Sequence, residues 1–345
     1  MRAAAITAQG TVEVLDQPQP EASGDLVVVQ ILVAPMCTEF KQRKGGVLSD
    51  AIGHEAAGVV VDAGSSRRFR EGDRVAVMPH YGCGLCEVCT SGDYMHCLNQ
   101  RDVLAETGQA YGTGYYAQYV LKPDWLLVRI PDDISLVHGA MACCGLGPSF
   151  GAAERLHLDA LDTFLVSGCG PVGLGALVHG AVRGARTLAI ETQPYRAELA
   201  RRLGAERVFD PTQEDVAEGV RALTDGRGAD AGLETSGAPL GAKTLAQSLR
   251  RRGRMAVVAW TGDIVLPPLV PLGVEVSGVW HWNSLTSVHR MWTTVRKARP
   301  LLDILITHVM PLEDVSAAMD LQDAGECGKV LLLPHGEFDD AVVVA

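Results

Sequence analysis

TFLVSGCGPVGLGALVHGAV, residues 163–182, is the stretch that decides the fold of this 345-residue chain. Its first five residues, Thr163 to Ser167, have the apolar character of a buried strand, and an apolar run of helical length follows. Between them, Gly168-Cys169-Gly170-Pro171-Val172-Gly173 matches the pattern G-x-G-x-x-G. The pattern alone is weak evidence, but its flanking strand and helix are those of a dinucleotide-binding βαβ unit. The segment therefore predicts such a unit.

The three glycines of this motif have separate expected roles. Gly168 makes the tight turn, Gly170 lets a pyrophosphate approach the backbone at the helix N-terminus, and Gly173 permits close packing of helix on strand. Pro171 and Val172, between the last two glycines, open the helix and belong to the same phosphate-binding turn. We expect all five residues to contact the cofactor.

The next predicted strand, RTLAIE, ends in Glu191, where a carboxylate can accept hydrogen bonds from the ribose hydroxyls of the adenosine. It would repel a 2'-phosphate, so we expect NAD. Arg196 keeps NADP open as the alternative, because a nearby arginine can accommodate the extra phosphate. A solvated carboxylate at a strand end is the other interpretation of Glu191.

The chain divides into two parts that differ in their pattern of apolar and polar residues. The first 120 or so residues contain short β-branched runs punctuated by Gly and Pro, which is typical of a β-rich domain with functional loops. From about Ser135, apolar strands alternate with amphipathic helices, which predicts a parallel, doubly wound sheet. Its predicted elements are strands at Thr163 to Ser167, Thr187 to Glu191, Arg207 to Asp210, Ala229 to Glu234 and Arg254 to Trp260, and helices at Tyr195 to Leu203 and Leu240 to Arg250.

Two of these strands should point their ends at the cofactor. The residues that follow them, Thr235 to Gly237 with Ser236 at the centre and Val257 to Trp260, lie where the carboxyl ends of parallel strands face a bound ligand. After Trp282 we expect a helix, a strand at Leu301 to Val309, a helix at Leu312 to Asp323 and a strand at Lys329 to Leu333. The sequence leaves open which of the two domains these elements complete.

Charge and composition exclude several classes of protein. The formal net charge of -11 argues against binding to nucleic acid or to an anionic membrane, because such binding needs clustered Lys and Arg. The uncharged stretch 163–182 approaches membrane-spanning length, but its glycines favour the strand, turn and helix. The first residues, MRAAAITAQG, show no signal-peptide core, so we expect a cytoplasmic protein with a small-molecule partner.

Four of the nine cysteines form one compact motif. Cys83, Cys86, Cys89 and Cys97 follow the spacing C-x2-C-x2-C-x7-C, which lets four thiolates surround one tetrahedral zinc ion with no open position. An iron–sulfur cluster and scattered free cysteines are the alternatives. We predict a structural zinc site.

Other candidate ligands are spread along the chain. Cys37, His54 and the pair Cys143-Cys144 are each ambiguous, since a lone histidine or cysteine is more often a packing residue than a ligand. Together, two thiolates and an imidazole, with water or substrate as the fourth ligand, form the ligand set of an open catalytic zinc site.

These pieces resemble the zinc-dependent medium-chain dehydrogenase/reductase family, and the resemblance covers nearly the whole chain. The matching segments are GHEAAGVV, the four-cysteine motif, CCGLGPSFGA, SGCGPVGLGA, the strand end at Glu191, LETSGAP and ECGKVLL. The resemblance implies a β-rich GroES-like catalytic domain at residues 1–139 and 284–345 and an NAD-binding Rossmann domain at 140–283. It also implies two zinc ions per chain and a homodimer or homotetramer.

The resemblance also implies roles for single residues. Those matching Cys37, His54 and Cys144 bind the catalytic zinc, and Cys144 is preferred to Cys143 because its distance to the following GPSFG segment fits the family pattern. Glu55 matches a residue that approaches the metal when water leaves. Thr38 matches the hydroxy residue that takes the alcohol proton.

Glu39 matches the acid that orients the zinc-bound histidine, in agreement with the usual pairing of a metal-bound imidazole with a carboxylate. The chain departs from the family at this segment, because Cys37 directly precedes Thr38 where the family has one residue between. Aligned without a gap, Met36 would occupy the ligand position. Lys41 replaces a histidine at the end of the proton relay, which leaves the proton exit open.

The expected reaction is oxidation of a secondary alcohol, with zinc as Lewis acid and NAD as hydride acceptor. Trp280 to Asn283 suggest a hydroxyl-rich pocket for a polyol, sugar or cyclitol, with an interface strand and helix cap as the other interpretation. Threonine-type amino alcohols are the second choice of substrate. A zinc-free reductase of activated double bonds and a non-catalytic nucleotide-sensing protein are the alternatives from other classes.

Overall fold

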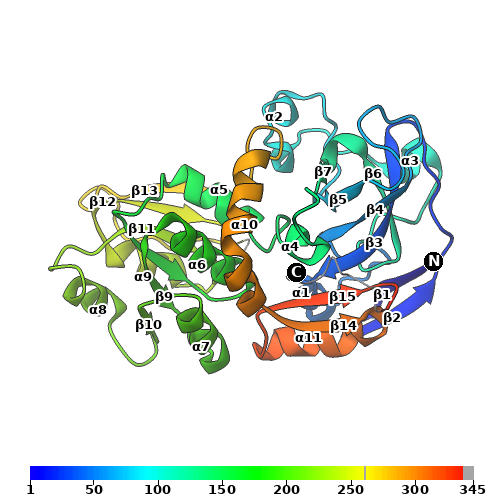
Figure 1. Ribbon diagram of the computed structural model, residues 1–345. Helices are drawn as coiled ribbons and strands as arrows, with labels where there is room; N and C mark the ends of the chain where they lie inside the picture. Colours follow the sequence, from blue (N-terminus) through cyan, green and yellow to red (C-terminus); the bar gives the residue numbers. More distant parts are fainter. Residues whose placement is uncertain (260–261, 337–345) are drawn as a thin grey trace.

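The computed structural model describes residues 1–259 and 262–336, so Trp260, the predicted end of one strand, lies outside the described residues. Two sheets form the two halves of the molecule, and the long helix α10 (Val288–Leu305) runs along the boundary between them (Figure 1). Both the C-terminal strands and the N-terminal strands belong to one half, so the chain crosses the boundary twice.

One half is a six-stranded parallel sheet with the order β10-β9-β8-β11-β12-β13. Counted in chain order this is 3-2-1-4-5-6, the order of a dinucleotide-binding doubly wound sheet. The strands are β8 (Thr163–Ser167), β9 (Arg186–Ile190), β10 (Arg207–Phe209), β11 (Ala229–Glu234), β12 (Leu249–Val257) and β13 (Glu275–Gly278). The helices are α5 (Gly147–Arg155), α6 (Pro171–Arg183), α7 (Pro194–Arg202), α8 (Val216–Ala222) and α9 (Gly241–Ser248).

Every residue of the central strand β8 is buried, as its apolar sequence predicts for a strand covered on both faces. From β8 the chain continues to β9 and β10 on one side of β8, and it then returns to β11 on the other side. The strand order therefore reverses beside β8. Such a reversal opens a crevice at the carboxyl ends of the strands. The G-x-G-x-x-G turn after β8 therefore lies at the expected place for a ligand.

The other half is a mixed sheet with the order β14-β15-β3-β4-β5-β7, and β6 pairs with β3. Its strands are β3 (Leu26–Pro35), β4 (Ala56–Asp62), β5 (Arg74–Val77), β6 (Tyr119–Pro123), β7 (Leu127–Arg129), β14 (Ile306–Pro311) and β15 (Lys329–Leu333), with a separate hairpin of β1 (Arg2–Ala8) and β2 (Thr11–Asp16). The helices here are α1 (Glu39–Gly45), α2 (Glu87–Thr90), α3 (Val103–Thr107), α4 (Leu136–Ala140), α11 (Val315–Ala324) and the 3-10 turns Tyr94–His96, Asp124–Leu126 and Leu312–Asp314.

Three predicted boundaries are wrong in instructive ways. Residues 301–305 of the predicted strand at Leu301 to Val309 belong to α10, because its buried stripe continues past Pro300 to Leu302 and Leu305. Burial of that stripe outweighs the cost of a proline inside the helix. The predicted helix ending at Arg250 stops at Ser248, and the strand predicted from Arg254 begins earlier, at Leu249, as β12.

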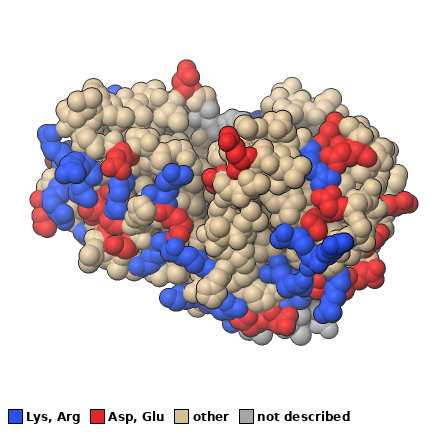
Figure 2. Space-filling view, turned by 90° about the horizontal axis from the view of Figure 1, so that it is seen from above, with Lys and Arg blue, Asp and Glu red and all other residues tan. Residues whose placement is uncertain are grey.

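The predicted domain limits at 139/140 and 283/284 stay a prediction, and the first falls inside α4. On the face shown in Figure 2, basic and acidic side chains are interspersed over both halves. Among residues 1–259 and 262–336, no helix has the length and apolar character needed to cross a membrane.

Candidate active site

The four cysteines of the compact motif lie together around α2, with their sulfur atoms all within 4.8 Å of one another. Cys83 Sγ is 4.0 Å from Cys89 Sγ, and Cys86 Sγ is 3.9 Å from Cys97 Sγ. Zinc–sulfur bonds of about 2.3 Å in a tetrahedron hold the sulfur atoms about 3.8 Å apart. The four thiols therefore fit a zinc ion that has no open position.

Backbone N–H groups favour the thiolate form in this motif. The amides of Leu85 and Cys86 donate to Cys83 Sγ at 3.4 and 3.3 Å and lower the pKa of Cys83. Similar donation from Leu98 and Cys89 lowers the pKa of Cys86 to about 6. Because thiolates are the metal-binding form, these two cysteines are prepared for a cation, whereas burial raises the pKa of Cys89 to about 12.

A second cluster joins residues from three separate parts of the chain. Its members, one donor atom from each lying within 4.8 Å of the others, are Cys37, His54, Glu55 and Cys144. Cys37 follows β3 and Cys144 lies in the turn between α4 and α5. His54 and Glu55 lie directly before β4. The fold thus assembles a ligand set that the linear sequence only suggests.

The structure accommodates the one-residue offset at Cys37. The side chain of Met36 is fully buried in the hydrophobic core, and its amide donates to Val330 O at 2.9 Å. The Cys37 thiol, rather than the thioether of Met36, reaches the cluster. Gln322 Nε2 donates to the Cys37 carbonyl at 3.0 Å and helps to fix this turn.

Glu39 contacts the histidine of the cluster. Its Oε1 lies 2.5 Å from His54 Nδ1, while its Oε2 accepts a 2.6 Å hydrogen bond from the Tyr116 hydroxyl. Burial opposes ionisation of Glu39, but the charge and hydrogen bonding of His54 and Tyr116 lower its pKa to about 2. With Nδ1 engaged, Nε2 is the nitrogen of His54 that can bind a metal.

Glu55 is completely buried and has both oxygens engaged. Lys329 Nζ lies 2.5 Å from Oε1, and the Gly145 amide donates to Oε2 at 3.1 Å. Burial raises the pKa of Glu55 to about 7 even though Lys329 opposes that shift. The remaining donors, Cys37, His54 and Cys144, match the set of three protein ligands that a zinc ion with one open position uses.

The charges around Cys37 favour its thiolate. Hydrogen bonding from Cys144 and from His54, together with the charge of Lys329, holds the pKa of Cys37 well below its usual range although burial raises it. A buried anion beside an imidazole and a second thiol is a donor set that a cation completes. The residues present therefore fit a catalytic zinc ion.

The predicted dinucleotide motif lines a cavity of about 470 Å³ at the carboxyl ends of β8 and β11. Gly168 has φ +85°, the left-handed region that glycine adopts without strain. A Cβ at Gly173 would lie 1.8 Å from Gly168 O, so only glycine permits this helix to approach. A Cβ at Gly170 would meet open space, which leaves its backbone accessible to a phosphate at the start of α6.

All eight residues predicted to contact the cofactor line this cavity: Gly168, Gly170, Pro171, Val172, Gly173, Glu191, Arg196 and Ser236. The carboxylate of Glu191 accepts hydrogen bonds from the amides of Cys169 at 2.7 Å and of Thr192 and Gln193 at 2.8 Å. These bonds fix the carboxylate at the rim of the turn.

Thr38 and Lys41, predicted to take part in proton transfer, line the same cavity as Cys37. Thr38 precedes α1, and its side chain makes no cap hydrogen bond to that helix. Its hydroxyl therefore remains available in the cavity. Lys41 lies one turn further along α1.

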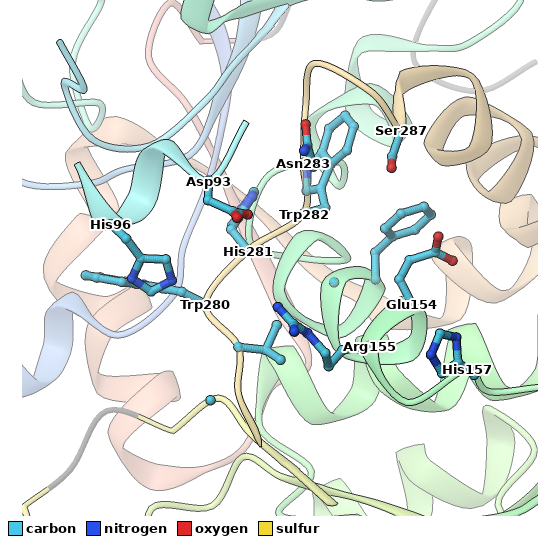
Figure 3. Close-up of a pocket in the computed structure, with 14 residues that line it drawn as sticks. Asp93, His96, Glu154, Arg155, His157, Trp280, His281, Trp282, Asn283 and Ser287 are labelled. Atoms are coloured by element: carbon cyan, nitrogen blue, oxygen red, sulfur yellow. The ribbon is translucent and has the colours of Figure 1, made fainter. Parts of the chain in front are cut away.

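Trp280 to Asn283 line a second cavity, of about 410 Å³, between the four-cysteine lobe and α5. Figure 3 shows Trp280 beside His96 on one side, with Glu154 and Arg155 on the other. Asn283 Oδ1 also accepts hydrogen bonds from the amides of Leu285 and Thr286 before α10. The segment thus has features of both the predicted pocket and the predicted helix cap.

Sequence reasoning missed three residues that hold the second cluster. Tyr116, Lys329 and Gln322 contact Glu39, Glu55 and Cys37 respectively, over sequence separations of 77, 274 and 285 residues. No local motif marks contacts at such distances. The lysine of ECGKVLL was the one available signal, because it is charged within an apolar strand.

Comparisons with known proteins agree with this architecture. The family model for the alcohol dehydrogenase GroES-like domain matches residues 23–132, and that for zinc-binding dehydrogenase matches residues 171–297. L-threonine 3-dehydrogenase of Symbiobacterium thermophilum is 32% identical over 299 residues, which is 82% of this chain and 81% of that protein. Sorbitol dehydrogenase of Bacillus subtilis is 28% identical over 353 residues, or 97% and 98% of the two chains.

Among solved structures, the alcohol dehydrogenase TADH from Thermus sp. ATN1 matches with a TM-score of 0.87 and 26% identity, covering 96% of this chain and 99% of that one. These matches confirm the predicted GroES-like and Rossmann fold class. Membership of the family implies zinc and a nicotinamide cofactor. The chain belongs to the zinc-dependent medium-chain dehydrogenase family and is an oxidoreductase that acts on CH-OH groups.

Proposed function

We propose that this protein is a zinc- and NAD-dependent dehydrogenase that oxidises a secondary alcohol, of the polyol, sugar or cyclitol class, to a ketone. One observation supports this proposal above all others. Cys37 belongs both to the second cysteine cluster and to the lining of the dinucleotide cavity. A metal ion held by Cys37, His54 and Cys144 would therefore adjoin the cofactor.

In this scheme zinc would act as a Lewis acid on the alcohol, and NAD would accept the hydride. The Thr38 hydroxyl accepts the alcohol proton, and Lys41 is the charged group next along the cavity. Glu39 keeps His54 in one orientation and tautomer. Glu55 with Lys329 supplies a buried ion pair that stabilises the turn at Gly145, beside Cys144.

The choice of a neutral polyhydroxylated substrate rests on two histidines. Burial lowers the pKa of His80 to about 4 and that of His281 to about 3, so both imidazoles are uncharged near neutral pH. Within the described residues, neither ring nitrogen of His281 has a hydrogen-bond partner. Unpaired neutral donors and acceptors are satisfied by hydroxyl groups without the cost of burying a charge.

A threonine-type amino alcohol is the second candidate. L-Threonine 3-dehydrogenases are among the relatives, and Asp93 and Arg155 place opposite charges on the lining of the second cavity. Such a pair suits a zwitterion. The polyol proposal is preferred because the imidazoles of His80 and His281, whose pKa values burial and the charge of His54 lower, are neutral near pH 7.

A substrate screen with zinc analysis tests the proposal. NAD reduction, followed by absorbance, should be faster with sorbitol, myo-inositol or 2,3-butanediol than with L-threonine, and the protein should hold two zinc ions per chain. Preference for L-threonine would select the second candidate. One zinc ion per chain and no alcohol oxidation would instead favour a zinc-free reductase of activated double bonds.

Cofactor choice has its own test. Replacing Glu191 by Ala removes the carboxylate expected to bind the ribose, so the preference for NAD over NADP should fall about tenfold, the value of one hydrogen bond to a charged group. We also expect the protein to be cytoplasmic and to form a homodimer or homotetramer. Light scattering would measure the number of subunits.

A further inference from the structure

Lys122 on β6 has a completely buried side chain in an unusual environment. Its Nζ lies 2.5 Å from the Tyr115 hydroxyl and 3.8 Å from the centre of the Tyr81 ring, and it donates to the carbonyl oxygen of His80. Within residues 1–259 and 262–336, no Asp or Glu forms an ion pair with it. Burial of an amine without a carboxylate partner costs free energy, so we looked for a role of Lys122 in the contacts that it makes.

The hydrogen bonds around the amine have a defined direction. The Tyr115 hydroxyl donates its proton to Met78 O at 2.7 Å, which leaves its oxygen to accept from Lys122. The amine thus has two oxygen acceptors, and the electron-rich face of Tyr81 covers it. Burial lowers the pKa of Lys122 well below its usual range, but a neutral amine still donates to both oxygens.

His80, whose carbonyl Lys122 binds, has a strained backbone. Its φ of +60° lies in the left-handed region, which residues other than glycine rarely adopt. Such residues persist where their surroundings hold them, and they concentrate at functional sites. Lys122 is the side chain that holds the carbonyl of this residue.

The ring of His80 packs against a residue that lines the second cavity. It packs edge-on against Trp280, with ring centres 4.9 Å apart, and Trp280 in turn lines the cavity with His96. Burial, and after it the charges of Lys122 and His54, lower the pKa of His80. The His80 imidazole is therefore in contact with a wall residue of the second cavity.

A neighbouring amide favours one tautomer of His80. Gln100 Nε2 lies 3.4 Å from His80 Nδ1, and because an amide nitrogen can only donate, Nδ1 accepts. The ring proton is then on Nε2. A neutral N–H donor in this position suits a second hydroxyl of a polyol.

We propose that Lys122 is a positioning residue, which holds the His80 carbonyl and thereby fixes the His80 imidazole against Trp280 as a hydroxyl-recognising wall of the substrate cleft. This inference rests on the proposed function, since it assigns the substrate wall of the same site. Lys122 acts only through His80 and touches neither substrate nor cofactor.

Kinetics of three variants test this coupling: Lys122→Met, His80→Ala and the double variant. Lys122→Met should raise KM for sorbitol about tenfold, the value of one hydrogen bond, and change kcat and the KM for NAD less than twofold. In the His80→Ala background, Lys122→Met should add no further increase. If the KM increases of the two single variants multiply in the double variant, the proposal is overturned, because the effects of independent sites add in free energy.

Tyr115→Phe is the matched control. It removes the other acceptor of the amine and leaves the His80 carbonyl contact, so it should lower the melting temperature and leave KM for sorbitol within twofold. A tenfold KM increase in this variant would show that general destabilisation, rather than His80, controls KM.

A readout that needs no turnover separates this inference from the proposed function. In protein with labelled histidines and two zinc ions, Lys122→Met should shift the His80 ring signal, which His80→Ala identifies by its loss, and leave the His179 signal in place. A shifted signal in a protein without alcohol oxidation would retain the positioning role and reject the function. An unmoved signal would reject the positioning role.

Discussion

The two cysteine clusters of this protein are built in opposite ways. Cys83, Cys86, Cys89 and Cys97 come from fifteen consecutive residues, and local backbone amides hold their sulfur atoms. The second cluster collects Cys37, His54, Glu55 and Cys144 from three segments and depends on residues as distant as Lys329.

Under the proposed function, this difference separates a site suited to a structural metal ion from a site suited to a catalytic one. Four thiols leave a tetrahedral ion no position for substrate. In the second cluster both oxygens of Glu55 are engaged elsewhere, so three donors leave one position open at the edge of the cofactor cavity. Substitutions in the two clusters should therefore have opposite consequences.

Replacing Cys144 by Ala should have the largest effect. Loss of one of three donors should remove the catalytic zinc, which is worth several kcal/mol in the transition state, so kcat/KM should fall on the order of 1,000-fold. Zinc content should fall from two ions per chain to one, and the melting temperature should change little. Cys143→Ala, at the neighbouring buried thiol, is the matched control and should keep both ions. Full activity in Cys144→Ala would remove the second cluster from the mechanism.

Replacing Cys89 by Ser should reverse this pattern. Zinc content should again fall to one ion per chain, but the protein should be destabilised, because the binding free energy of a structural zinc is also folding free energy. We expect a loss on the order of several kcal/mol in urea unfolding, with less than a tenfold change in kcat for the protein that remains folded. A 1,000-fold loss of kcat with unchanged stability would contradict the structural role.

Replacing Glu39 by Gln should have an intermediate effect that is confined to the second cluster. The amide keeps the shape of the side chain but loses the charge beside His54, and removal of such an outer partner costs about 10- to 100-fold in metal affinity or activity. Competition with a chelator should show faster loss of one zinc ion, while the four-cysteine site keeps its ion. Equal loss from both sites would argue against a specific role for Glu39.

The comparison also explains how much the sequence could predict. Short-range patterns predicted the parallel sheet, its G-x-G-x-x-G turn and the four-cysteine motif, because each is set by spacing within about twenty residues. The end of α10 was missed since burial of Leu302 and Leu305, a tertiary effect, outweighs the signal of Pro300. The support of the second cluster by Tyr116 was also missed, because a pairing across 77 residues leaves no local pattern.

The offset at Cys37 shows where a family pattern alone is insufficient. Counting positions would place Met36 at the metal, and only the path of the chain after β3 shows that Met36 packs in the core. The backbone at this turn is held by Gln322 from α11, near the other end of the chain. Three-dimensional contacts therefore decide which sulfur atom joins the second cluster.

The smallest predicted effect concerns His179, a buried residue of α6 that braces the segment carrying Cys144. Its ring nitrogen Nε2 lies 3.0 Å from Leu146 O, and burial lowers its pKa to about 3. The unfolded chain has a histidine pKa of about 6.5, so the unfolded state binds more protons between these values. The stability contributed by neutral His179 is therefore present well above pH 6.5 and is lost as the pH falls toward 3, by roughly 1 kcal/mol when the pH reaches 5.5.

In His179→Gln the amide can still donate to Leu146 O but does not titrate, so this part of the acid sensitivity should disappear. Urea unfolding at pH 7.5, 6 and 5.5, with zinc content measured at each pH, compares the variant with the unsubstituted protein. If both lose stability in parallel while zinc is retained, His179 is not the titrating group. If zinc is released first from the second cluster, that cluster rather than α6 controls acid stability, and the contrast between the two cysteine clusters extends to their response to pH.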